Sequence, residues 1–183
     1  QYVSGEYANY LGEFTTMVET LNGRATFLTS AITDAALSNC DLLVLTVSYA
    51  GGVTYPYAAA ELDAICRYAQ SGGSILLCGK GDRSETGEIA AVTNQNLLLE
   101  ALGSGTRFRT DTLYDNSNYG SANYQVKFTA SEFLDLDSRY TAGVEQGKLE
   151  FIFHSGCSIA LGEGASAIVT GGSGSSVVTA LVQ

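Results

Sequence analysis

Residues 41–82 read DLLVLTVSYAGGVTYPYAAAELDAICRYAQSGGSILLCGKGD, and this stretch predicts a strand, a crossover helix and a second strand parallel to the first. The apolar run at residues 41–47 has strand length and does not alternate, which is typical of a strand covered by helices on both faces. Pro56 is expected in the first turn of the helix, and Gly72-Gly73 ends it with a left-handed cap. The apolar stripe of this helix is predicted at Ala58, Leu62, Ile65, Cys66 and Ala69, with Glu61 on another face. Residues 74–78 form the second strand. Such a pair crosses over right-handedly and gathers ligands at the loops after its strands.

The flanking sequence extends this unit in both directions. We expect an amphipathic helix over residues 6–21, a short strand at 25–29, a helix at 94–102 and a strand near 107–110. The Tyr-, Asn-, Ser- and Gly-rich residues 113–124 are typical of a loop. Short strands divided by Gly-rich turns follow at residues 149–153, 158–161, 167–170 and 177–182. These elements predict a flavodoxin-like three-layer α/β sandwich with a mainly parallel sheet and a C-terminal third richer in short strands.

Composition narrows the function classes. At 183 residues the chain is predicted to form one domain over residues 1–183. Its net charge of −10 argues against nucleic-acid binding, which needs a basic face to meet phosphate. No run approaches the roughly 18 to 20 apolar residues of a membrane span. Abundant Tyr, Ser and Gly with few Lys favour an extracellular or cell-surface protein.

Several motifs carry a family resemblance. Residues 41–47 (DLLVLTV) and 59–79 (AAELDAICRYAQSGGSILLCG), with Asp82 soon after, resemble the class I glutamine amidotransferase-like superfamily. The similarity lies nearest its non-catalytic, often extracellular branch. Residues 96–103, 140–144 and 164–169 resemble later parts of such domains. The resemblance implies an amidotransferase-like α/β domain and, in the catalytic members, a cysteine nucleophile paired with a histidine.

The catalytic signature of that superfamily is incomplete here. Its nucleophile lies in a Gly-x-Cys-x-Gly turn, whereas Leu76 and Lys80 flank Cys78 at the two glycine positions. The single histidine, His154, lacks the His-x-Glu spacing of the catalytic pair. We therefore expect no catalytic residues. The alternative is a cysteine-dependent hydrolase or amidase that uses Cys78 and His154.

The resemblance also implies missing strands. Domains of this kind usually open with a strand before the first helix and continue beyond the region similar to residues 177–183. We therefore expect a part of a longer polypeptide, or a chain whose sheet is completed by others. Such completion would pair β-edges between chains and bury more than roughly 1,000 Å². An oligomer, or a repeating subunit of an ordered extracellular assembly, is the corresponding alternative function.

The cysteines and acidic turns provide two possible sites. Cys40, Cys66, Cys78 and Cys157 lack the paired spacing of a zinc motif and are interpreted as small buried residues. If a disulfide forms, Cys40 with Cys66 is the favoured pair. The oxygen ligands of Asp111, Asp115, Asn116 and Asn118 suit either calcium or turns, and turns are favoured. No cofactor or metal is assigned.

The predicted ligand-binding face consists of residues in the loops after the two parallel strands: Tyr49, Tyr55, Tyr57, Lys80 and Asp82. The tyrosines could stack on a sugar or contact a protein, and both readings stay open. The loop from Gly79 could instead present N–H groups and Lys80 to an anion, or be a tight turn. Together these features predict a non-catalytic binding or assembly module of a larger extracellular or cell-surface protein, contacting protein neighbours or carbohydrate.

Overall fold

The computed structural model describes residues 12–47, 49–50, 53–54, 56–81, 89–129, 132–133, 150–171 and 176–182. The chain divides into two compact units, Gln1–Cys78 and Gly79–Gln183. Whether they form one domain over residues 1–183 stays a prediction. In the described part of the chain no helix is long and apolar enough to cross a membrane.

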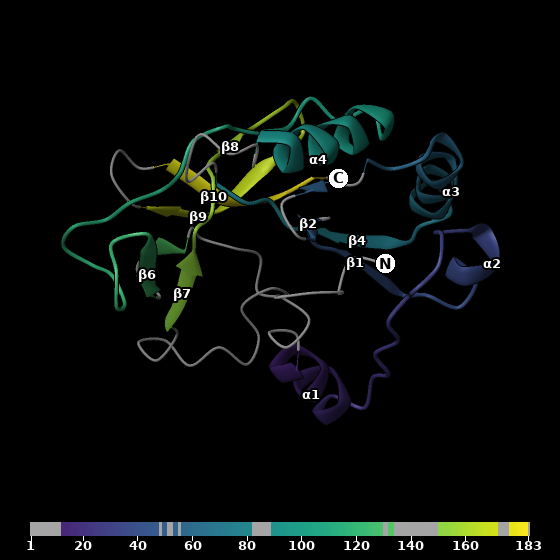
Figure 1. Cartoon of the computed structure of the whole chain (residues 1–183), viewed down its shortest axis with the longest axis horizontal. Helices are drawn as coiled ribbons and strands as arrows, with labels where there is room; N and C mark the ends of the chain where they lie inside the picture. Colours follow the sequence, from purple (N-terminus) through teal and green to yellow (C-terminus); the bar gives the residue numbers. More distant parts are fainter. Residues whose placement is uncertain are drawn as a thin grey trace. The chain divides into compact units, whose positions relative to one another are not determined.

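The N-terminal unit contains the predicted strand, helix and strand (Figure 1). Its elements in chain order are α1 (Gly12–Thr20), α2 (Asp34–Leu37), β1 (Leu42–Leu45), β2 (Tyr49–Ala50), β3 (Val53–Thr54), α3 (Ala59–Gln70) and β4 (Ser74–Leu77). The expected helix over residues 6–21 is described from Gly12 to Thr20, and Asn22, just beyond its end, is in the left-handed region at φ 61°. The strand expected at residues 25–29 is wrong, since these residues form no strand.

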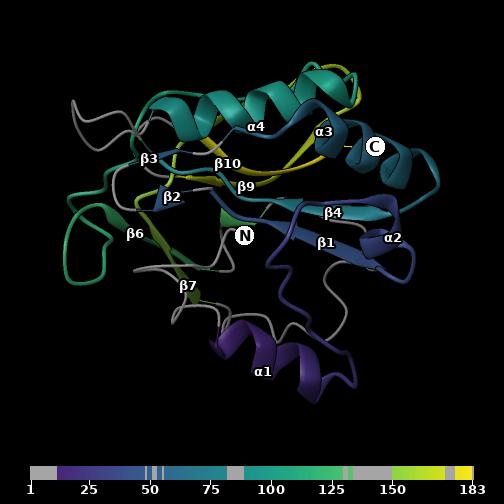
Figure 2. The ribbon, with the colours of Figure 1, turned by 45° about the vertical axis from the view of Figure 1, so that its right-hand side comes forward.

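β1 and β4 lie side by side and run parallel, which confirms the prediction from residues 41–82. Leu42 is opposite Ser74, and Val44 is opposite Leu76. Figure 2 shows α3 on one side of this strand pair. Gly72 follows the end of α3 with φ 94°, a left-handed backbone conformation that turns the chain toward β4. Glycine suits this position because the same conformation is strained for residues with a Cβ.

α3 begins at Ala59, three residues after Pro56, so the prediction of Pro56 in its first turn is wrong. Its buried face is also rotated from the predicted one: Glu61, Ala64, Ile65 and Tyr68 are buried. A carboxylate on the buried side is stable here because Glu61 accepts hydrogen bonds from two backbone N–H groups.

The C-terminal unit contains one described helix and short antiparallel strands. Its elements are α4 (Ile89–Ala101), β5 (Arg107–Phe108), β6 (Gln125–Thr129), β7 (Glu150–His154), β8 (Ile159–Ala160), β9 (Ser166–Gly171) and β10 (Ser176–Leu181). The pairs are β5 with β8, β6 with β7 and β9 with β10. The apolar C-terminal run predicted to pair with another chain thus pairs with β9 on one edge. The hydrophobic core of the C-terminal unit contains Leu113, Val126, Phe128, Val169 and Val178.

The predicted fold class is wrong. The described strands form separate two-stranded sheets, of which β1–β4 alone is parallel, so no flavodoxin-like sandwich with a mainly parallel sheet is seen in these residues. Short connections such as residues 172–175 between β9 and β10 join antiparallel strands, whereas parallel strands need a long crossover. The continuous apolar run of β1 predicted a strand that is covered on both faces. This prediction is wrong for the face that carries Leu42, because Leu42 is exposed.

Candidate functional site

The residues of the predicted ligand-binding face lie in different parts of the chain. Tyr49 lies in β2, where its backbone pairs with Thr54. Tyr57 is half-buried before α3, and Lys80 is half-buried at the start of the C-terminal unit. Tyr55 and Asp82 lie outside the described residues. The predicted face as a whole therefore stays a prediction.

The loop after β4 packs tightly within the C-terminal unit. Gly81 is buried, and its N–H donates to the Ser155 carbonyl oxygen at 2.8 Å. A Cβ on Gly81 would lie 2.7 Å from the Gly156 carbonyl oxygen and 2.9 Å from Thr112 Oγ1. The N–H of Gly81 is therefore occupied by the protein, which favours the tight-turn reading of this loop over the anion-binding one.

The environment of Cys78 is that of a structural thiol. Its backbone N–H donates to the Leu45 carbonyl oxygen at 2.9 Å, which places it at the end of the β1–β4 pair. Burial raises the pKa of the Cys78 thiol, whereas a nucleophilic cysteine needs a lowered pKa. His154 is exposed in β7 and contacts the Tyr124 ring edge-on, with 5.3 Å between ring centroids. The absence of catalysis stays a prediction, and these surroundings support it.

None of the four cysteines is part of a disulfide, so the Cys40–Cys66 bridge is not formed. Burial also raises the pKa of Cys66, and burial together with the nearby charge of Asp111 raises that of Cys157 to about 12. These thiols are protonated near neutral pH, as expected of small residues in apolar surroundings.

Asp111, the first of the proposed calcium ligands, is used to hold two segments together. Its carboxylate accepts hydrogen bonds from Ser158 N at 2.8 Å and Ser158 Oγ at 2.5 Å. The segment after β5 is thereby joined to the segment before β8, which itself pairs with β5.

The other three proposed ligands stabilise turns in the loop before β6. Asp115 Oδ1 accepts hydrogen bonds from the Ser117 hydroxyl at 2.7 Å and from the N–H groups of Ser117 and Asn118 at 2.7 and 3.0 Å, and these bonds, that of the hydroxyl first, lower the pKa of Asp115. Asn118 Nδ2 donates to the Lys127 carbonyl oxygen, and Asn116 Oδ1 accepts from Asn123. Among the described residues, no group of three His, Cys, Asp or Glu could hold a metal ion. Turn formation thus accounts for these side chains.

The N-terminal unit instead presents an apolar sheet face, defined here as Leu42, Val44 and Leu76. Parallel pairing places these side chains on one side of β1–β4, because opposed residues share a side of the sheet. Leu42 is 48% exposed and Leu76 is 43% exposed, whereas Leu45, on the other side, is 2% exposed. Leu42 lies opposite Ser74 and Leu76 lies opposite Val44, so the two exposed leucines occupy successive positions on this sheet face.

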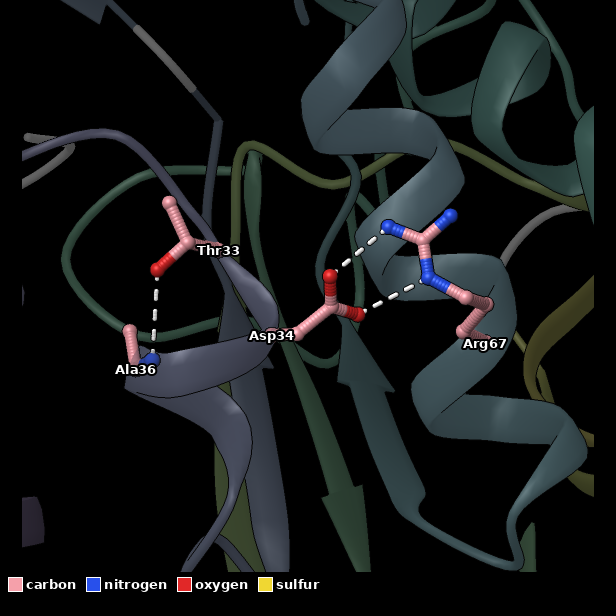
Figure 3. Close-up of polar contacts among 4 residues, drawn as sticks. All are labelled: Thr33, Asp34, Ala36 and Arg67. Atoms are coloured by element: carbon pink, nitrogen blue, oxygen red, sulfur yellow. Dashed lines mark hydrogen bonds and ion pairs between the residues drawn. The ribbon is translucent and has the colours of Figure 1, made fainter.

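A polar hollow of about 490 Å³ lies at the end of this strand pair. It is lined from α2 by Asp34 and Leu37, from the chain before β1 by Cys40 and Asp41, and from the last turns of α3 by Arg67 and Tyr68. Figure 3 shows the contact across its rim, where Arg67 Nε and Nη2 donate to the two Asp34 carboxylate oxygens at 2.9 and 2.8 Å. The Thr33 hydroxyl caps α2 by accepting from Ala36 N at 3.2 Å.

The sequence analysis missed both features. The hollow joins residues from α2 and α3, and the 33-residue separation of Asp34 from Arg67 leaves no local pattern. The sheet face was missed because a continuous apolar run cannot reveal which side is exposed.

No protein-family model and no curated protein matches this chain. Among solved structures, the chain is similar to the mmIFT52 N-terminal domain, with a TM-score of 0.65 and 23% sequence identity over 88% of this chain and 70% of that one. At this identity the likeness concerns the fold.

These comparisons correct three predictions. The resemblance to the class I glutamine amidotransferase-like superfamily is contradicted, because the matching fold is that of a domain of an intraflagellar transport protein. The description as an amidotransferase-like, secreted, carbohydrate-binding protein is contradicted by the same match. The predicted extracellular or cell-surface location is contradicted by this match as well. The motifs behind the resemblance were features of strand, helix and glycine turn, which unrelated α/β proteins share.

Proposed function

We propose that this chain is a non-catalytic protein-binding module that docks a partner protein on the apolar sheet face of Leu42, Val44 and Leu76. The observation that carries the proposal is the exposure of Leu42 and Leu76 on the same side of β1–β4. Each exposed leucine side chain that a partner covers contributes favourable burial of apolar area, of order 25 cal/mol per Å².

Two further observations support the proposal. The thiol of Cys78 is in surroundings that raise its pKa, and the acidic side chains Asp111 and Asp115 are committed to holding turns. The similar solved structure is a domain of a protein of intraflagellar transport, a setting consistent with protein partners. A protein-binding role needs no reactive group, and the exposed sheet face supplies a surface for it.

Selection from a random-peptide display library tests the proposal. The full chain should enrich binding peptides, and the Leu42→Ser/Leu76→Ser variant should bind them at least about tenfold more weakly. The matched control is Leu97→Ser/Leu161→Ser, which changes two leucines of similar exposure, 48% and 42%, in the C-terminal unit. Circular dichroism establishes that each variant is folded. If no peptide is enriched, or if the control variant weakens binding equally, the proposal is wrong.

A further inference from the structure

We propose that Asn22-Gly23 is a site of spontaneous deamidation and that the C-terminal cap of α1 controls the reaction, which proceeds only while the last turn of this helix is open. The sequence contains an Asn-Gly pair once, at this position. The pair lies just beyond the end of α1 at Thr20, and both of its residues are exposed. The site is independent of the apolar sheet face.

The end of α1 has the hydrogen bonds of a Schellman motif. The N–H of Gly23 donates to the Val18 carbonyl oxygen at 2.9 Å, and the N–H of Asn22 donates to the Glu19 carbonyl oxygen at 3.0 Å. Asn22 is the left-handed residue of this motif, with φ 61°. These two bonds and this backbone conformation satisfy the last carbonyl groups of a helix.

The geometry of the cap accounts for both residues of the pair. Position 22 needs a residue that tolerates positive φ, and asparagine serves there in place of glycine. Position 23 has no room for a side chain, since a Cβ would lie 2.8 Å from Val18 Cγ1 and 3.0 Å from the Val18 carbonyl oxygen. The cap therefore places the residue without a Cβ, whose backbone nitrogen is the least shielded, directly after a side-chain amide.

Deamidation joins two groups of this pair. The backbone nitrogen of Gly23 attacks Asn22 Cγ, so a bond forms between these two atoms while the bond from Cγ to Nδ2 breaks. Ammonia leaves with the proton that the Gly23 nitrogen gives up, and a cyclic succinimide remains. Water then opens the ring at either of its carbonyl carbons, which leaves aspartate or isoaspartate at position 22.

The closed cap prevents the attack. The Gly23 nitrogen must lose its proton to act as a nucleophile, whereas in the cap its N–H donates to the Val18 carbonyl oxygen. This N–H points back at the helix, so the peptide unit between Asn22 and Gly23 must turn before the nitrogen can reach Cγ. Both steps require the last turn of α1 to open, and the opening of a helix end is among the least costly local motions of a folded protein.

Neither product restores the cap. Isoaspartate adds a methylene group to the main chain, which changes the spacing of the two N–H groups that bond to Val18 and Glu19. Aspartate places a negative charge at a helix end that already carries partial negative charge and has Glu19 in its last turn. Deamidation therefore turns a reversible opening of α1 into a permanent one.

Deamidation rates at position 22 provide the test. The full chain is incubated at mildly alkaline pH, folded or in guanidinium chloride, and its proteolytic peptides are separated and weighed by mass spectrometry. The unfolded chain should react at least about tenfold faster than the folded one. Folded Thr20→Gly should react about fivefold faster than folded Thr20→Ala, because both lose the hydrogen bond from Thr20 Oγ1 to the Thr16 carbonyl oxygen but glycine favours the open helix.

The matched controls are Glu100→Gly and Glu100→Ala, which make the same exchange at an exposed position of α4 and should react at equal rates. Circular dichroism establishes that each variant is folded. Hydrogen exchange then measures the consequence for α1. After incubation, the amides of residues 21–23 should exchange faster in the wild type than in Asn22→Gly, which keeps a residue suited to positive φ and has no side-chain amide to lose.

Each outcome is decisive. If position 22 does not react in the unfolded chain, or reacts as fast in the folded chain, the inference is wrong. Equal rates in Thr20→Gly and Thr20→Ala, or an equally large difference between the Glu100 variants, would show that the opening of α1 does not control the reaction. If the incubated wild type exchanges no faster than Asn22→Gly, the cap survives deamidation and the permanent opening is refuted.

Discussion

Glu61, 6% exposed in α3, accepts a hydrogen bond of 3.0 Å from the backbone N–H of Ile32, which lies 29 residues earlier in the chain. The other carboxylate oxygen accepts from Ala58 N, also at 3.0 Å, at the start of α3. One side chain therefore caps a helix that has alanine at its N-cap and fixes the segment that leads into α2. The buried carboxylate has a structural use and is not a candidate for acid or base catalysis.

Replacing Glu61 by alanine should lower the free energy of unfolding by roughly 2 to 4 kcal/mol, because two N–H groups lose a charged acceptor. Urea denaturation followed by circular dichroism measures the change. The control Glu100→Ala, at an exposed position of α4, should stay within about 0.5 kcal/mol of the wild type. Equal stability of Glu61→Ala and the control would contradict the role given to this carboxylate.

The case of Glu61 illustrates how much of α3 could be predicted from the sequence. The helix and its Gly72-Gly73 end followed from local signals, namely apolar spacing and left-handed glycine. The buried face did not, because spacing alone allowed the stripe through Leu62 and placed Glu61 outside it. Satisfying a buried carboxylate needs a donor from Ile32, and that distant contact leaves no trace in the local pattern.

Gly162 lies against the backbone of the segment before β5. A Cβ at this position would overlap the Gly105 carbonyl carbon and lie 2.5 Å from Thr106 N, and Gly162 N itself donates to Thr106 Oγ1 at 3.1 Å. Gly162→Ala should therefore lower the free energy of unfolding by about 1 to 3 kcal/mol, since backbone atoms must move apart. Urea denaturation measures this change. In the control Gly12→Ala nothing lies within 4 Å of the added Cβ, so stability should not fall; a smaller effect at Gly162 than at Gly12 would refute the packing argument.

Most of the antiparallel strands could be located from the sequence, but their pairing could not, because the signals in the sequence are local. Strands β7, β8, β9 and β10 were found at their approximate positions because Gly-rich turns separate them. β6 was missed, although Val126 and Phe128 alternate with Gln125, Lys127 and Thr129, a period of two. That alternation is real, since Val126 and Phe128 are buried in the core. The pairing of the strands, and hence the fold class, depends on long-range contacts that turn signals do not specify.

The side chain of Asn96 in α4 makes two hydrogen bonds to the backbone of β5, one to a carbonyl and one to an N–H group. A residue of a neighbouring strand would make the same two bonds. Asn96 Nδ2 donates to the Phe108 carbonyl oxygen at 2.9 Å, and Asn96 Oδ1 accepts from Phe108 N at 2.8 Å. Asn96→Asp should lower the free energy of unfolding by about 1 to 3 kcal/mol, because an acceptor would replace the donor that faces the carbonyl. Thermal unfolding tests this against Leu97→Ala, an exposed neighbour on α4 that should change stability less. A larger loss at Leu97 would rule out the strand-like role of Asn96.

The buried thiols predict a loss of stability at alkaline pH. Burial, with a contribution from the charge of Asp111, raises the pKa of Cys157 to about 12, and burial also raises that of Cys78. In the unfolded chain a cysteine ionises near pH 8.5, so above that pH the unfolded state loses protons that the folded state keeps. The stabilisation is thus complete below about pH 8.5 and is lost as the pH rises toward 12.

The slope of stability against pH is the quantity to measure. Urea denaturation between about pH 8 and about pH 10 should give a free energy of unfolding that falls with pH in the wild type and falls less steeply in Cys157→Ala. Because the comparison concerns slopes, the constant loss from the smaller alanine side chain does not affect it. The Cys78→Ala/Cys157→Ala double variant should flatten the profile further, since both thiols shift in the same direction. Equal slopes in all three proteins would mean that these thiols ionise as readily folded as unfolded, and would reopen Cys78 as a reactive residue.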